Sequence, residues 1–204
     1  MDKLRRLIDI IISLFVLIIL FPFFVLIAVL IVILDGTPIF YIQKRVGKNG
    51  KLIKIIKFRT MKQNSEKILE NSLKENPSLA KEWKKYRKLK KDPRVTKIGK
   101  FLRRYSLDEL PQFINVLKGD MTLIGPRPYI VEELKEANIS EKELKKLLSV
   151  KPGITGLWQV EKRNNSSLRG RVKIDLLYIK RKNFLLDLKI LLKTLVVIVK
   201  GKGV

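Results

Sequence analysis

The chain has 204 residues, and its 44 Lys and Arg against 19 Asp and Glu give it a formal net charge of +25. It contains no Cys and no His, which excludes disulfides, Cys/His zinc sites, thiol nucleophiles and Ser-His-Asp catalysis. Any acid–base or metal chemistry must therefore come from Asp, Glu, Lys, Arg, Tyr or water. Apolar residues make up 46% of the chain, enough to bury a core, and this length fits one domain, or one domain with an appendage.

The first feature along the chain is an uncharged, apolar run from Ile10 to Leu34. As one helix it would be about 37 Å long, enough to cross a hydrocarbon layer of about 30 Å. Pro22 lies in the middle of the run, and a proline inside a helix removes a backbone donor and predicts a kink. Basic residues flank the run on both sides, which favours the cytoplasmic side for both ends. We therefore expect residues 1–35 to form a re-entrant membrane helix that bends at Pro22. A single spanning helix and a buried core helix are the alternatives.

Two short β-prone segments follow the apolar run. Residues 38–45 and 52–58 are rich in Ile, Phe and Tyr, and Gly47-Lys48-Asn49-Gly50 between them has the composition of a turn. This pattern predicts one small β-hairpin. All residues from 36 to 204 are expected to form one cytoplasmic domain.

Helical patterns dominate the remaining sequence, so the expected fold class is α+β and predominantly helical. An insert at about residues 62–92 contains two such patterns, at 65–75 and 77–91. The second begins with Asn76-Pro77, a favourable N-cap followed by a proline at the first helical position. Further helices are expected at 107–117 and 140–148.

The last segment, Phe184 to Val199, is rich in Leu, Ile and Val but carries a stripe of lysines on one helical face. The stripe consists of Lys182, Lys189, Lys193 and Lys200. Such an amphipathic helix suits the membrane interface, with its ammonium groups at anionic headgroups. It suits packing on the protein's own core equally well, and the sequence leaves both alternatives open.

A basic run from Lys81 to Arg104 is interleaved with Trp83, Tyr86 and Phe101, a composition that fits a nucleic-acid surface. It also fits a solvated helix that faces anionic lipid. Because an apolar anchor lies in the same chain, we expect anionic membrane lipid, and no nucleic acid, as the partner.

Two adjacent carboxylates, Asp108 and Glu109, are the strongest candidates for catalysis. They follow Arg103-Arg104 and stand where a helix is expected to begin. In a structural interpretation, Ser106-x-x-Glu109 is a capping box, and acids in a first turn complement the helix dipole. In a functional interpretation, a carboxylate held at a positive helix end acts as a nucleophile or metal ligand, and the arginines bind phosphate oxygens.

Three further charged residues have two interpretations each. Arg127 lies between two prolines, so a stiff backbone presents its guanidinium either to an anion or to a structural acid. Asp175 and Asp187 lie among apolar residues and lysines, where most acids are partners in salt bridges.

The segment 152–159 contains two glycines, which allow backbone to approach a ligand closely. Gln159 and Arg163 follow them and provide hydrogen-bonding groups. The alternative is a loop that caps the core with Trp158.

With these residues in view, the chain resembles the bacterial sugar transferases, monotopic polyprenyl-phosphate phosphoglycosyl transferases. The similar segments occur in the family's order and with similar spacing from the first residues to the last. They are Lys57-Phe58-Arg59-Thr60-Met61, Asp92-Pro93-Arg94-Val95-Thr96-Lys97-Ile98-Gly99, Ser106-Leu107-Asp108-Glu109-Leu110-Pro111-Gln112, Gly119-Asp120-Met121, Gly125-Pro126-Arg127-Pro128 and Pro152 to Gln159. The insert is similar to the branch that transfers galactose- or glucose-phosphate, and the chain looks like the catalytic domain of that branch.

The resemblance implies transfer of hexose-1-phosphate from a UDP-sugar to undecaprenyl phosphate, with release of UMP. This would be the first membrane step of a surface polysaccharide or O-antigen pathway. It implies Asp108 as the nucleophile that forms a covalent aspartyl-phosphosugar intermediate, Glu109 as its partner acid, and Mg²⁺ as the cofactor that both would hold. Positions that the family uses around the diphosphate, the nucleotide or the acid pair are Lys57, Arg59, Arg103, Arg127, Glu132, Gln159, Arg163, Asp175 and Asp187.

The implied location is the bacterial inner (cytoplasmic) membrane, with the catalytic domain on its cytoplasmic face. The sequence leaves open which sugar is transferred and whether the chain forms a homodimer. One rival function is a membrane-tethered basic protein that binds nucleic acid or anionic lipid without catalysis. Another is a structural membrane adaptor in which the two acids only cap a helix.

Overall fold

The computed structural model describes residues 2–87, 89–161 and 166–201, and within them the chain is mostly helical. Helices α1 (Asp2–Ile19) and α2 (Phe21–Asp35) form the apolar N-terminal segment and are bent by 60° relative to each other. The bend lies at Leu20, and Pro22 stands in the first turn of α2, where its missing N–H interrupts no helical hydrogen bond. The segment therefore bends where the sequence contains the proline.

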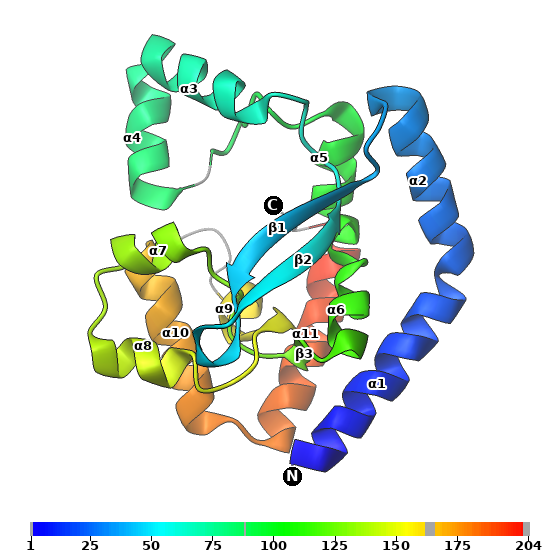
Figure 1. Ribbon diagram of the computed structural model, residues 1–204, viewed down its shortest axis with the longest axis vertical. Coiled ribbons are helices and arrows are strands. Elements are labelled where there is room, and N and C mark those ends of the chain that lie inside the picture. Colours follow the sequence, from blue (N-terminus) through cyan, green and yellow to red (C-terminus); the bar gives the residue numbers. More distant parts are fainter. Residues whose placement is uncertain (1, 88, 162–165, 202–204) are drawn as a thin grey trace.

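Within the described residues, no helix taken singly has the length and apolar composition to cross a membrane, whereas α1 and α2 meet these criteria as a bent pair. Many of their large apolar side chains are exposed, including Phe15, Ile18, Phe21 and Ile33. The pair runs along one side of the molecule in Figure 1. An apolar face is therefore left uncovered by the rest of the described protein.

Strands β1 (Phe40–Val46) and β2 (Leu52–Phe58) form an antiparallel hairpin, and the turn between them contains the 3-10 element η1 (Lys48–Gly50). Asn49 and Gly50 adopt left-handed backbone conformations in this turn, with φ of 55° and 79°. Asn and Gly are the residues that tolerate this conformation best. The predicted hairpin is confirmed.

The insert at 62–92 forms two helices, α3 (Ser65–Glu75) and α4 (Pro77–Tyr86), which lie far from α1 and α2 in Figure 1. Asn76 caps α4 as expected, because its side-chain oxygen accepts hydrogen bonds from two backbone N–H groups of the first turn. The helix ends before the predicted residue 91, since Arg87 adopts a left-handed conformation with φ of 49°.

The helix expected at 107–117 is divided. The 3-10 turn η2 (Leu107–Glu109) lies between α5 (Lys97–Arg104) and α6 (Gln112–Lys118). Pro111 directly precedes α6, and a proline has no N–H with which to continue a helix from η2. The capping-box interpretation was also wrong: Ser106 has a left-handed φ of 57°, and its side chain makes no capping hydrogen bond.

A second sheet was not expected, so the prediction of only one hairpin was incomplete. Strands β3 (Thr122–Ile124) and β4 (Gly153–Thr155) pair in parallel, and three-residue strands are too short to show a periodic pattern. A Cβ atom on Gly153 would lie 2.1 Å from the backbone nitrogen of Gly125. Gly153 is therefore required for contact between two backbone segments, and not for approach to a ligand.

The remaining helices are α7 (Val131–Glu136), α8 (Glu141–Leu147), α9 (Leu157–Glu161), α10 (Leu168–Arg181) and α11 (Phe184–Val199). The helix predicted at 140–148 is confirmed by α8. Helix α11 packs on the protein through Ile190, which is 1% exposed, while Leu185 and Val199 on α11 are 75% and 80% exposed. Core packing by α11 is thus confirmed, and membrane contact through its exposed apolar side chains stays a prediction.

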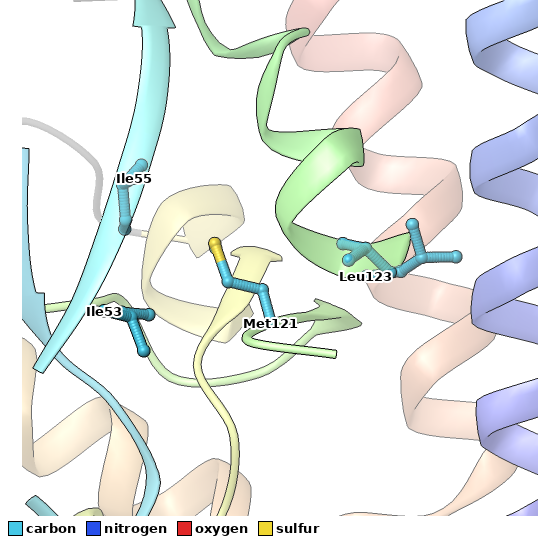
Figure 2. Close-up of a cluster of buried hydrophobic side chains, with 5 residues drawn as sticks. Ile53, Ile55, Met121 and Leu123 are labelled. Atoms are coloured by element: carbon cyan, nitrogen blue, oxygen red, sulfur yellow. The ribbon is translucent and has the colours of Figure 1, made fainter. Parts of the chain in front are cut away.

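The central core lies between the hairpin and the second sheet. Figure 2 shows Ile53 and Ile55 on β2, with Met121 and Leu123 in and beside β3, and these four residues form one buried cluster together with Val116 of α6. The cluster connects β2 with α6 and β3, the segments on which α1 packs. Lys57, near the end of β2, contacts the acid pair.

Polar side chains on α1 fix it to this core. Arg6 donates two hydrogen bonds to carbonyls at the end of α6, at 2.6 and 2.9 Å. Asp9 accepts hydrogen bonds from Thr122 and from the backbone N–H of Leu123. The apolar N-terminal segment is therefore held in a defined position relative to the rest of the chain.

Candidate active site

The two adjacent acids lie in η2 and face the end of β2. Lys57 Nζ donates to Glu109 Oε1 at 2.7 Å but lies 4.0 Å from Asp108 Oδ2. Asp108 is buried, and within the described residues no other side chain donates a hydrogen bond to it. The Lys57 ammonium is thus bound by Glu109, which leaves the lone pairs of the Asp108 carboxylate available for chemistry.

The electrostatic environment of Asp108 contains opposing influences. Burial raises the pKa of its carboxyl group, and the Glu109 charge raises it further, while Lys57 and Arg103 act in the opposite direction. Removing a carboxylate from water disfavours its charged form. Asp108 therefore depends on neighbouring cations to remain ionised.

Arg103 approaches the acids from α5. Its Nε donates to Thr60 Oγ1 at 2.9 Å. The helix can lie this close because of Gly99, where a Cβ atom would fall 2.2 Å from the carbonyl oxygen of Thr60. Burial lowers the pKa of Arg103, and the charge of Asp108 partly offsets this effect. The guanidinium is therefore held within electrostatic reach of the candidate nucleophile.

Arg127 comes from the loop before α7. Its backbone N–H donates to Asp175 Oδ2 at 3.1 Å, and its guanidinium carbon lies 5.5 Å from the centroid of the Trp158 ring. Within the described residues, the guanidinium makes no hydrogen bond to protein, and its Nε is enclosed without a partner. Burial lowers the pKa of Arg127, but Glu133 and Glu109 raise it above its usual value. A charged guanidinium with free N–H donors is suited to an anion.

A pocket open to solvent lies beside these groups and is lined by Lys57, Glu109 and Arg127, but not by Asp108 or Arg103. Its walls come from both hairpin strands, η2, α6, β4, α9 and the loop before α7. The lining residues are Arg45, Ile55, Lys57, Glu109, Gln112, Arg127, Pro128, Ile154 and Gln159. Three of them are cations and one is an acid, so the pocket favours an anionic ligand.

Arg45 and Gln112 line the pocket but were not identified from the sequence. Arg45 Nη1 donates to Glu133 Oε2 at 3.2 Å. Burial and the charge of Arg127 lower the pKa of Arg45 to about 10. Burial opposes ionisation of Glu133, but Arg127 and Arg45 lower its pKa below the usual value. Glu133 is therefore the common counter-ion of two pocket arginines. In the sequence, Arg45 is one of several basic residues after the apolar segment, and nothing distinguishes it there.

Gln159 also lines the pocket. Its Nε2 donates to the carbonyl of Ile154 at 2.8 Å, while its Oε1 is enclosed without a partner among the described residues. The adjacent Trp158 is 4% exposed. Two neighbouring residues of α9 therefore differ in role, since Gln159 lines the pocket and Trp158 packs in the interior. Arg163, the other candidate from this region, lies outside the described residues.

Six candidate residues of the described chain do not line the pocket: Asp108, Arg103 and Asp175, and also Arg59, Glu132 and Asp187. Arg59 donates hydrogen bonds to three carbonyls at and beyond the end of α2. Glu132 is exposed on α7, and it is Glu133 that is buried. Asp187 pairs with Arg5 of α1 at 2.8 Å. Among the residues expected around the diphosphate, Arg59 and Asp187 therefore have structural partners in this state of the protein.

Asp175 supports the site from the interior. It is fully buried, and its Oδ2 accepts hydrogen bonds from the Tyr129 hydroxyl at 2.8 Å and from the Arg127 N–H. Burial raises the pKa of Asp175 to about 7, although these two hydrogen bonds oppose the rise. Asp175 thus holds the backbone of the Arg127 loop and does not reach the pocket.

The donor set for a metal ion is restricted to the acid pair. Among the described residues, no group of three or more acidic side chains is placed to hold a metal ion. Asp108 and Glu109 nevertheless provide adjacent carboxylates, and Mg²⁺ is commonly bound through one or two carboxylates together with substrate phosphates. The pair fits a Mg²⁺ ion shared with a phosphate-bearing substrate, and does not form a complete protein cage.

A helical domain that places an acid pair beside a cationic pocket is suited to an enzyme that acts on phosphorylated substrates. The chain belongs to the bacterial sugar transferase family, whose model matches residues 1–201.

Several relatives align with this chain over nearly its whole length. The exopolysaccharide production protein ExoY of Sinorhizobium fredii is 41% identical over 98% of this chain and 87% of its own length. The undecaprenyl-phosphate galactose phosphotransferase of Salmonella typhimurium is 43% identical over 98% of this chain but 41% of its own length. The UDP-glucose:undecaprenyl-phosphate glucose-1-phosphate transferase of Escherichia coli is 36% identical over 94% of this chain and 39% of its own length. The chain thus spans most of one relative and about two fifths of the other two.

Proposed function

We propose that the protein transfers a hexose-1-phosphate from a UDP-sugar to undecaprenyl phosphate and releases UMP, through a covalent intermediate on Asp108. The observation that carries the proposal is the pocket with the acid pair at its edge. Glu109 and Arg127 line the pocket, and the Arg127 guanidinium makes no hydrogen bond to any described residue. Asp108, next to Glu109 in the chain, is a buried carboxylate that accepts no hydrogen bond from a described side chain. The names of the relatives that act on undecaprenyl phosphate support the same substrate class.

The reaction proceeds by two displacements at one phosphorus atom. A carboxylate oxygen of Asp108 attacks the phosphorus that bears the sugar, and the bond from that phosphorus to the bridging oxygen breaks. UMP leaves with the bonding electron pair. A phosphate oxygen of undecaprenyl phosphate then attacks the same phosphorus, the bond to Asp108 breaks, and the carboxylate is restored. Dividing the transfer in this way lets a soluble donor and a lipid acceptor use one site in turn.

Asp108, and not Glu109, is assigned as the nucleophile because of how Lys57 is bound. The 2.7 Å hydrogen bond from Lys57 occupies Glu109, whereas the 4.0 Å separation leaves Asp108 unbonded to it. The carboxylate and the phosphoryl group are both negatively charged and repel each other, so cations must neutralise the charge of the donor's diphosphate. Arg45, Lys57 and Arg127 line the pocket and are placed to do this.

Mg²⁺ is the proposed cofactor. Asp108 and Glu109 would hold it together with the donor's diphosphate, and when bound it supplies positive charge that stabilises the leaving group. The protein's own contribution is to keep the two carboxylates adjacent in η2.

The bent pair α1–α2 is the proposed re-entrant membrane segment, with the catalytic domain at the cytoplasmic face of the bacterial inner membrane. Leu107, the residue before Asp108, packs in one cluster with Ile27 and Ile31 of α2. The acid pair is thereby fixed close to the apolar segment, where a lipid phosphate would be presented. Exposed basic residues of α5, which packs on α2, are placed to meet anionic headgroups, whereas α4 lies on the far side in Figure 1.

The test is release of UMP by purified protein in detergent with Mg²⁺, undecaprenyl phosphate and a panel of UDP-sugars. Asp108→Asn is expected to abolish release, because an amide cannot act as the nucleophile, while Glu66→Gln on the exposed insert helix α3 serves as the matched control. Without acceptor, intact-mass measurement should show one added hexose phosphate on the wild type and none on Asp108→Asn. Full turnover by Asp108→Asn would refute the assignment. Tight, salt-sensitive binding of DNA by both proteins without UMP release would favour the non-catalytic basic binder.

A further inference from the structure

The indole ring of Trp158 contacts two guanidinium groups. Arg127 lies 5.5 Å from its centroid, and Arg171 of α10 lies 4.9 Å from it. Trp158 and Arg171 are 4% and 6% exposed. Cation–π attraction is strongest at desolvated sites such as this one. One buried ring thus connects the pocket arginine to an arginine that does not line the pocket.

Arg171 is fixed by backbone groups from two distant parts of the chain. Its Nε donates to the carbonyl of Ser166 at 3.2 Å, and its Nη2 donates to the carbonyl of Tyr86 at 3.1 Å. Ser166 lies just before α10, and Tyr86 is the last residue of insert helix α4. The Arg171 guanidinium is therefore held by backbone groups that lie outside the pocket.

Arg127 has no such fixation at its guanidinium. Its hydrogen bond to Asp175 holds only the backbone, and its side chain contacts the Trp158 ring and the field of Glu133. The like charge of Arg171 acts on Arg127 from the interior. The Trp158 ring and the charge of Arg171 thus both act on the Arg127 side chain, which lines the pocket.

We propose that Arg171 is a positioning residue for donor binding: it fixes Trp158, and Trp158 holds the guanidinium of Arg127 against the pocket. This inference rests on the proposed function, because it takes Arg127 as a ligand of the donor's diphosphate. Arg171 itself touches no substrate. Because Arg171 also binds the end of α4, the insert is part of the support for the pocket, although it lies outside its walls.

The principal variant is Arg171→Lys, which keeps the charge but removes the planar group that stacks and donates two hydrogen bonds. The KM for the UDP-sugar is expected to rise about tenfold, since a displaced binding group weakens the donor complex. The melting temperature in detergent should fall by a few degrees, because the carbonyls of Ser166 and Tyr86 lose this donor, so KM is compared at a temperature where both proteins are folded. Arg94→Lys is the matched control: Arg94 stacks on Trp83 at 5.0 Å, in the insert, so the same type of contact is removed elsewhere. Its KM should equal that of the wild type.

A double-variant cycle separates positioning from a general structural effect. In an Arg127→Gln background, Arg171→Lys should cause no further change in KM, because the group that it positions is already absent. Independent, multiplicative effects of the two substitutions would overturn the proposal. Failure of the proposed function itself would be recognised separately, because the wild type would then release no UMP.

A binding measurement covers the case in which Arg171→Lys folds poorly. The chain has two tryptophans, so Trp83→Phe leaves Trp158 as the sole source of indole fluorescence. UDP is expected to change this emission when it binds Arg127. With Trp83 retained, calorimetric titration with UDP should show that Trp158→Phe keeps its affinity for UDP through its aromatic face, whereas Trp158→Leu loses it. Equal UDP affinity of the Phe and Leu variants would contradict the proposal.

Discussion

Two arginines of the chain show how the same side chain can serve structure or binding. Arg59 is 7% exposed, and its Nη atoms donate to the carbonyls of Asp35, Gly36 and Thr37, although its Nε has no partner in the described part of the chain. Arg127 lines the pocket, and its guanidinium makes no hydrogen bond to any described residue. Arg59 binds the carbonyls at the end of α2, whereas Arg127 keeps its N–H donors available for a ligand.

The difference lies in the local supply of carbonyl groups. The end of α2 leaves backbone carbonyls without helical partners, and the segment after β2 passes close enough for Arg59 to bind them. Near Arg127, Asp175 Oδ2 binds the backbone N–H and Glu133 binds Arg45, and no acceptor among the described residues bonds to the guanidinium. Substitution of each arginine should therefore affect a different property of the protein.

Replacing Arg127 should produce the larger effect, and it should be on activity. Arg127→Gln removes the charge but keeps a polar side chain, and kcat/KM for UMP release is expected to fall by about 10² to 10³. The melting temperature should stay within a few degrees of the wild type, because no hydrogen bond to protein is lost. Wild-type activity in this variant would show that the pocket does not bind the donor phosphate through Arg127.

Replacing Arg59 should instead affect stability. Arg59→Met keeps the length of the side chain but removes the donor from the carbonyls of Asp35 and Gly36 and leaves the Thr37 carbonyl only its hydrogen bond from Gln63, which should lower the free energy of unfolding by about 2 to 3 kcal/mol. Chemical denaturation in detergent measures this loss. At a temperature where the variant remains folded, its KM for the UDP-sugar should match that of the wild type. A stable variant with a strongly raised KM would reverse the roles assigned to the two arginines.

The sequence could not distinguish these roles, because the motif that contains Lys57 and Arg59 shows only that two cations stand two residues apart. Which of them faces the acids depends on the pairing of β1 with β2 and on the path of the chain after α2, and both are tertiary features.

The hairpin, the cap at Asn76 and the bend beside Pro22 depend on local chemistry, and they were predictable. The parallel pair β3–β4 depends on contact between residues far apart in the chain. Arg45 has no local signal, since its importance comes from Glu133 and Arg127.

Asp175 offers a smaller test of the same comparison, because it holds the backbone of Arg127 and not its guanidinium. Its pKa of about 7 in the folded protein exceeds the value of about 3.9 expected in an unfolded chain. As the pH rises from 4 to 7, the unfolded chain loses this proton while the folded chain retains it, so the group favours unfolding increasingly. Above pH 7 the effect is constant.

Asp175→Asn removes this ionisation and keeps an oxygen that can accept from Tyr129. The variant is expected to gain roughly 2 kcal/mol over the wild type at pH 8, since a buried unpaired charge is removed. The gain should shrink steadily as the pH is lowered toward 4. Denaturation of both proteins at pH 5 and pH 8 checks the prediction, with Asp120→Asn as a control. A stability difference that does not vary with pH would mean that Asp175 is ionised throughout this range, with its charge balanced by the Arg127 guanidinium. In that case the donors of Arg127 would not be reserved for a ligand.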